Sequence, residues 1–92
     1  IVRRQHTVIP HPTEHRLKTA KVFYLTSTKT ASAAEHLALA FTRTHRATLV
    51  GEHTAGANHF GGDEPVGAGL ELWLPVGRTL DPDTGKDWEG AG

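Results

Sequence analysis

The sequence has 92 residues, fewer than the roughly 100–150 of a typical domain, so it holds at most one small domain or part of a larger one. Its ten basic and ten acidic residues cancel, which excludes the basic surface expected of a nucleic-acid-binding protein. The absence of cysteine excludes disulfides, thiolate zinc sites and a cysteine nucleophile. No apolar run approaches the roughly 20 residues that span a bilayer, so we expect no membrane span in this segment.

The ends of the sequence suggest a piece of a longer protein. Methionine is absent at every position, including the first, and the chain stops on Gly90-Ala91-Gly92. A folding unit this small buries only about 60% of its surface. We therefore expect the remainder of a parent chain to be a partner of this segment.

The first predicted elements are an arm and a strand. Residues 1–20 show no helical or strand period, and Pro10 and Pro12 forbid a continuous helix. We interpret them as a connecting arm, and residues 21–92 as the C-terminal part of a catalytic core. The apolar, β-forming run at 22–25 predicts a strand that is buried on both faces.

A helix and a second strand follow. Ala34, Leu37, Ala38 and Phe41 fall at i, i+3, i+4 and i+7, which predicts a helix from about Ala31 to residues 45–46. Residues 47–50 then resume β character up to a glycine. A strand, a helix and a strand within about thirty residues form a βαβ-type unit, so we predict an α/β fold with parallel pairing and a right-handed crossover.

The last third of the chain is rich in glycine. Residues 52–69 hold five glycines among polar residues, and we predict a long functional loop there. Residues 70–76 alternate, with leucines and a valine on one face, which predicts a half-buried strand; Pro75 places it at an edge or an end. A turn is expected at 81–85, with Trp88 as an anchor for the last residues of the chain.

Ser32 is the candidate nucleophile. It lies where a strand and a short turn lead into a helix, and the first-turn N–H groups of that helix can stabilise an oxyanion. Ser32-x-x-Glu35 is also a capping box, which explains both residues without any chemistry. The local motif supplies no activating base.

A longer pattern resembles the serine peptidases of family S41, which comprise tail-specific (C-terminal processing) proteases and interphotoreceptor retinoid-binding protein modules. The resemblance implies a fragment of the ClpP/crotonase-like spiral, with a strand-helix-strand unit, a glycine-rich loop and a further strand or hairpin. It also implies that Ser32 is the catalytic nucleophile, that Ala33 offers an oxyanion N–H and that Glu35 supports the catalytic group. The motifs that carry it are Val22-Phe23-Tyr24-Leu25-Thr26-Ser27, Thr30-Ala31-Ser32-Ala33-Ala34-Glu35, Arg46-Ala47-Thr48-Leu49-Val50-Gly51-Glu52, Thr54-Ala55-Gly56, Leu72-Trp73-Leu74-Pro75-Val76-Gly77 and Trp88-Glu89-Gly90.

The expected substrate loop departs from the tail-specific pattern. It reads Gly56, Ala57, Asn58, with Ala57 where those proteases carry the lysine of a Ser–Lys dyad. The loop is more similar to the retinoid-binding branch, which also lacks the lysine. The base is then an imidazole from upstream in the parent, as in the tricorn-like branch, or one of the histidines that flank this loop, His59 or His53. The alternative is that the domain no longer cleaves peptides.

Metal and cofactor sites are not expected. His11 and His15 are four residues apart, but the intervening Pro12 opposes the helix that would bring them together. Residues 81–85 begin like a calcium loop, but the glycine comes one position early, and an ordinary turn explains them better.

Two functions of different classes remain open, besides a purely structural interaction domain. The first is a peptidase that hydrolyses peptide or protein substrates; the resemblance places part of its oxyanion hole upstream of residue 1, so the isolated segment is expected to be inactive. The second is a non-catalytic module of the same fold that binds a retinoid or fatty acid. The resemblance also suggests an exported or periplasmic parent and a homo-oligomer as a candidate assembly, while the sequence itself assigns no compartment.

Overall fold

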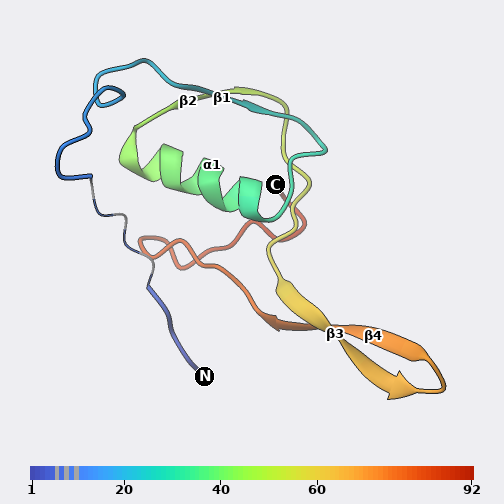
Figure 1. Cartoon of the computed structure of the whole chain (residues 1–92). Helices are drawn as coiled ribbons and strands as arrows, with labels where there is room; N and C mark the ends of the chain where they lie inside the picture. Colours follow the sequence, from blue (N-terminus) through green and yellow to red (C-terminus); the bar gives the residue numbers. More distant parts are fainter. Residues whose placement is uncertain (6, 8, 10) are drawn as a thin grey trace.

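The computed structural model describes residues 1–5, 7, 9 and 11–92. Pro10, one of the two prolines that oppose a helix in the arm, lies outside the described residues. The described part contains one small α/β unit and one hairpin, drawn in Figure 1. In chain order the elements are β1 (Phe23–Thr26), α1 (Ala33–Thr44), β2 (Thr48–Gly51), β3 (Phe60–Gly67) and β4 (Leu70–Gly77).

The strands β1 and β2 pair in parallel, as predicted, with Tyr24 opposite Leu49. Gly51 closes the pair because its backbone has a φ of +134° and a Cβ there would meet the Thr26 carbonyl oxygen at 2.0 Å. Only glycine tolerates this combination of conformation and close approach. The βαβ interpretation of the sequence is confirmed.

The helix α1 packs along one face of this small sheet. The Tyr24 hydroxyl donates to the Ala34 carbonyl oxygen at 3.0 Å, and its ring meets Phe41 edge to face with centroids 5.4 Å apart. Among the described residues, Ala38 of this helix is the buried apolar side chain, at 8% exposed. The helix ends at His45, whose φ of 51° is the left-handed conformation of a helix C-cap.

The other face of the sheet is open, which corrects one prediction. Phe23 is 62% exposed and Leu25 is 74% exposed, while Tyr24 and Thr26 turn toward the helix. The apolar run at 22–25 therefore forms a strand that is covered on one face, not on both. The reason is that a single helix, α1, packs on the sheet within the described residues.

The second half of the predicted glycine-rich loop is a strand. β3 pairs antiparallel with β4, with Gly62 opposite Leu74 and Asp63 opposite Trp73, and the register shifts once near each end of the strand. Gly61 is required here because a Cβ would approach the Leu74 carbonyl oxygen to 2.0 Å. The glycines had suggested a loop, but the pairing depends on backbone groups that β4 supplies.

The β3–β4 hairpin extends away from α1 and the β1–β2 sheet (Figure 1). The predicted half-buried face of residues 70–76 is exposed, with Leu70 at 65% and Val76 at 76%. Alternation places Leu70, Leu72 and Leu74 on one face, and the register shifts at Val76. Nothing in the described chain covers this face. Pro75 stands in an edge strand, as predicted, because this sheet has two strands.

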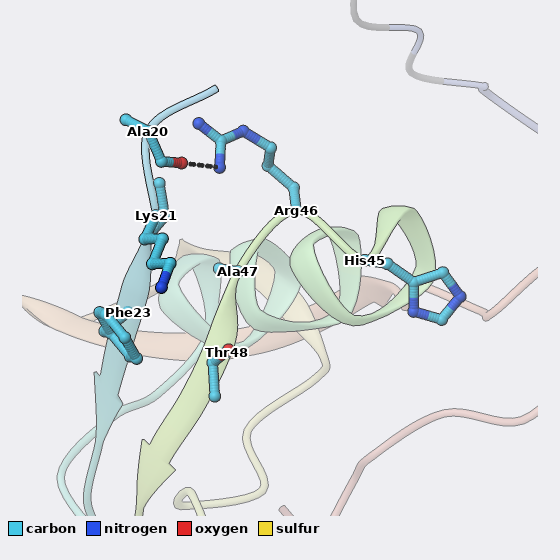
Figure 2. Close-up of a pocket in the computed structure, with 8 residues that line it drawn as sticks. Ala20, Lys21, Phe23, His45, Arg46, Ala47 and Thr48 are labelled. Carbon is cyan, nitrogen blue, oxygen red and sulfur yellow. Dashed lines mark hydrogen bonds between the residues drawn. The ribbon is translucent and has the colours of Figure 1, made fainter. Parts of the chain in front are cut away.

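The arm before β1 is held by Arg46. Its guanidinium donates to the carbonyl oxygens of Leu17 and Ala20, the latter at 2.9 Å, as Figure 2 shows for Ala20. Residues 11–20 contain no helix or strand. Whether residue 20 marks a boundary of the core stays a prediction.

The predicted turn at 81–85 is present: the Gly85 N–H donates to the Asp81 carbonyl oxygen at 2.7 Å. Arg43, in the last turn of α1, pairs with the carboxylates of Asp81 and Asp83 at 3.2 and 2.8 Å. These pairs hold the turn against the helix. Within the described residues, no helix has the length and apolar character that crossing a bilayer requires.

Candidate active site

Ser32 occupies the sharp turn between β1 and α1. Its φ of 55° and ψ of −118° lie outside the regions that non-glycine residues ordinarily adopt, and the residue is exposed. The preceding turn is fixed by two bonds between Ser27 and Thr30, backbone to backbone at 2.9 Å and backbone to hydroxyl at 3.0 Å. A strained serine on a strand-to-helix turn is the backbone geometry of a nucleophile elbow.

The first turn of α1 leaves an N–H group available beside this serine. The N–H groups of Glu35 and His36 both donate to the Ser32 carbonyl oxygen, at 2.9 and 3.0 Å. Among the described residues, no hydrogen bond takes up the Ala33 N–H. The positive end of the helix and a free N–H therefore lie directly after Ser32, where an oxyanion would need a donor.

Glu35 links the serine turn to the glycine-rich loop. Its side chain is buried, at 3% exposed. One carboxylate oxygen accepts from the Ser32 N–H at 2.7 Å and from the Ala57 N–H at 2.9 Å, and the other accepts from the Gly56 N–H at 2.6 Å. A single carboxylate thus fixes two segments that lie more than twenty residues apart.

Burial alone would raise the pKa of Glu35. The hydrogen bonds from the Thr54 hydroxyl and from the Gly56, Ala57 and Ser32 N–H groups outweigh it and hold the pKa below its ordinary value of 4.5. The carboxylate is therefore ionised at neutral pH. In this state it is a structural acceptor and has no proton to donate.

The predicted capping box accounts for one contact between Ser32 and Glu35: the Ser32 N–H donates to the Glu35 carboxylate at 2.7 Å. The box alone does not account for the further bonds from Glu35 to residues 56 and 57. The glutamate therefore does more than cap a helix.

The predicted substrate loop is ordered by side chains from both sides. Asn58 is buried, at 5% exposed, and its amide exchanges hydrogen bonds with the Thr79 backbone at 2.6 and 2.8 Å. Ala57 contributes its N–H to Glu35. The N–H groups of residues 56–59 are therefore all taken up by the carboxylates of Glu35 and Glu89.

The sequence interpretation missed the carboxylate that contacts His59. Asp63 and Glu64 are the acids nearest to it in sequence, but Glu89 lies against its ring, with Nδ1 and a carboxylate oxygen 3.4 Å apart. Glu89 also accepts the N–H groups of Asn58 and His59 at 2.6 and 3.0 Å. Glu89 belongs to one of the family motifs, but the sequence did not indicate this contact because Glu89 and His59 are thirty residues apart.

Residues 88–92 form a C-terminal strap across the glycine-rich loop. The Gly90 N–H donates to the Gly56 carbonyl oxygen at 2.8 Å. Gly56 has a φ of +80°, and a Cβ there would meet Gly90 at 2.9 Å. Trp88 packs near the His36 ring with centroids 6.2 Å apart, as expected of an anchor.

A cavity of about 290 Å³ lies beneath this strap. Its apolar lining includes Ala38, Leu39, Leu49 and Trp88, and His53 stands at its wall. The indole N–H of Trp88 is buried and has no hydrogen-bond partner among the described residues.

The structure does not join every predicted site residue. Ser32, Glu35, Gly56 and Ala57 meet through one carboxylate, and Asn58 and His59 meet through another. Within the described residues, no hydrogen bond connects Ser32 with His59. No group of three or more histidine or acidic side chains in the described part is arranged to hold a metal ion.

An α/β unit presents an exposed serine at a helix N-terminus, with an N–H group free beside it among the described residues. The model of peptidase family S41 matches residues 2–92, and the chain belongs to this family. It is thus a fragment of a serine peptidase-type domain, as the sequence motifs had indicated. No match was found among solved structures.

Proposed function

We propose that this segment carries the nucleophile of a peptide-hydrolysing domain and that Ser32 is that nucleophile. The observation that supports it is the strained, exposed backbone of Ser32 at the start of α1, followed by the free Ala33 N–H. A strained residue persists only where its surroundings hold it, and Glu35 does so here through the Ser32 N–H.

Each group then has a defined role. The Ser32 hydroxyl loses its proton to a base as its oxygen attacks the peptide carbonyl carbon, and the Ala33 N–H donates to the oxyanion that forms. The amine leaves with a proton, and water releases the acyl group from Ser32. Glu35 holds the serine turn and the loop at Gly56 and Ala57 in register, while that loop lies beside the bound peptide.

His59 is the candidate base within this chain, since Glu89 contacts its ring and fixes its backbone. An imidazole from the upstream part of the parent is the alternative. Either choice is consistent with alanine at position 57, which removes the amine that the tail-specific proteases use.

The test is labelling of the full-length parent with a serine-directed fluorophosphonate. We expect labelling that Ser32→Ala abolishes, and that His59→Gln reduces at least about tenfold if His59 is the base. Unchanged labelling of His59→Gln would assign the base upstream. A folded parent that is not labelled at all would refute the proposal. The isolated 92-residue segment is expected to show no peptide hydrolysis.

The cavity beneath the strap favours a second candidate function, the binding of an apolar ligand. Leu39, Leu49 and Trp88 in its lining suit an acyl or polyene chain. Threonine side chains, Glu35, Glu52 and His53 supply the polar part of the lining. Titration of the parent with retinol and a fluorescent fatty acid tests this function. Saturable binding that Leu49→Asn weakens would support it, and the absence of saturation would exclude it.

A further inference from the structure

The β3–β4 hairpin has an apolar face that nothing in the described chain covers. Side chains of alternate residues in the regular part of β4 share this face, and we call Leu70, Leu72 and Leu74 the leucine ladder. They are 65%, 51% and 41% exposed. Because a two-stranded hairpin is marginal by itself in water, a ladder of this kind is expected to be covered when it functions.

The hairpin also offers strand edges. β3 and β4 form a two-stranded sheet, so each strand has one edge whose backbone groups are not paired within it. Such an edge can accept an extended peptide as an added strand, with main-chain bonds giving affinity and side-chain contacts giving selectivity.

The charge on the hairpin is of one sign. Asp63, Glu64 and Glu71 are exposed, and residues 60–77 contain no lysine, arginine or histidine. None of the ion pairs between described residues includes these three acids. Glu64 stands opposite Leu72, so negative charge borders the apolar ladder.

The position of the hairpin connects it with the candidate site. β3 starts at Phe60, directly after His59, and three residues after Ala57, which shares the Glu35 carboxylate with Ser32. A peptide added along β3 would therefore continue toward the serine turn.

We propose that the β3–β4 hairpin is a docking arm for the substrate and that it selects extended segments in which apolar residues alternate with lysine or arginine. The apolar side chains would lie on the face of the leucine ladder. The cationic side chains would lie on the other face of the hairpin, which carries Asp63 and Glu71, opposite Trp73 and Pro65 in the register. This inference rests on the proposed peptidase function, because it assigns that site its substrate class.

The test measures binding to the full-length parent that carries Ser32→Ala, so that no cleavage intervenes. Two fluorescent peptides of equal length are compared, one alternating leucine with lysine and one alternating leucine with glutamate. We expect the lysine peptide to bind at least about tenfold more tightly, with a preference that falls as salt is raised. The combined variant Asp63→Asn, Glu64→Gln, Glu71→Gln should remove the preference, whereas Glu52→Gln, an exposed carboxylate outside the hairpin, should keep it.

A ladder variant separates apolar docking from charge. Leu72→Thr with Leu74→Thr keeps the β-propensity and the acids, and should weaken binding of both peptides. Equal affinity for the two peptides, or a preference that survives loss of the three acids, would overturn the proposal. A third outcome would also overturn it. If the parent binds neither peptide but associates with itself as its concentration rises, and the ladder variant abolishes this association, then a second copy of the chain occupies the face.

The two proposals fail in different ways. A fluorophosphonate is small and reports on Ser32 without the hairpin. Labelling without peptide binding would overturn the docking arm alone. Peptide binding by a parent that is not labelled would overturn the peptidase function.

Discussion

At the scale of single residues, the Glu35 side chain holds more parts of the candidate site together than the serine does. Its carboxylate is buried, and it collects N–H donors from the serine turn and from the glycine-rich loop. Such a group is costly to leave unpaired and useful when it is fully paired. The candidate site therefore depends on the ionised state of this side chain.

We predict that Glu35→Gln lowers the free energy of unfolding by about 1–3 kcal/mol, because the amide has one acceptor oxygen and its NH₂ group would face N–H donors. Since the pKa of Glu35 is below its ordinary value of 4.5 in the folded state, its stabilisation is present above that value and is lost as pH falls through the folded pKa. Urea unfolding of the parent across this pH range should show that the free energy of unfolding falls less steeply with decreasing pH in the variant than in the wild type.

Glu52→Gln is the matched control, since residue 52 is exposed and lies just after β2. It should leave both the stability and its acid dependence within about 0.5 kcal/mol of the wild type. An equal loss in both variants would argue against a special role for Glu35.

At the scale of elements, the site is formed by three segments that meet at one end of the small sheet. The turn into α1 carries Ser32, the loop after β2 carries Gly56 and Ala57, and the C-terminal strap closes over the loop. Parallel strands bring the ends of β1 and β2 to the same edge, so the two loops that come after them are neighbours. The strap can pass this close to the loop because residue 56 of the loop is a glycine.

We predict that Gly56→Ala destabilises the parent by about 1–3 kcal/mol, because a side chain at φ +80° is strained and its Cβ meets Gly90. The same change at Gly62, where nothing lies within 4 Å of a Cβ and φ is not positive, should change stability by less than about 1 kcal/mol. Thermal unfolding of the two variants provides the comparison. Equal effects would show that the strap does not constrain the loop.

At the scale of the whole molecule, the chain consists of a small packed unit and an arm that leaves it. The described residues extend over 54 × 31 × 27 Å, and the hairpin accounts for much of the elongation in Figure 1. One helix on one sheet face gives a small core, and many large apolar side chains stay exposed. Both the open face of the β1–β2 sheet and the leucine ladder are surfaces on which other chain or substrate is expected to pack.

This division predicts different local stabilities. In native-state hydrogen exchange of the 92-residue chain, amides of α1 should be protected most, and amides of β3 and β4 should exchange at least about tenfold faster. The physical reason is that the hairpin bonds are exposed while α1 packs on the sheet through Tyr24 and Phe41. Equal protection throughout would mean that the hairpin folds as one unit with the rest.

The sequence by itself determined the local elements and the family. Apolar periodicity located β1, α1 and β2 because a helix and a buried strand leave different repeats in the chain, and the motifs identified the S41 resemblance that the family match confirms. Only the tertiary structure decided where residues distant in sequence meet. Glu89 reaches His59 and Glu35 reaches Ala57 because loops and a strap converge at one edge. β3 forms because β4 pairs with its backbone, and a pattern of side chains does not predict this pairing. The leucine ladder faces solvent because no other element of the described chain packs against it.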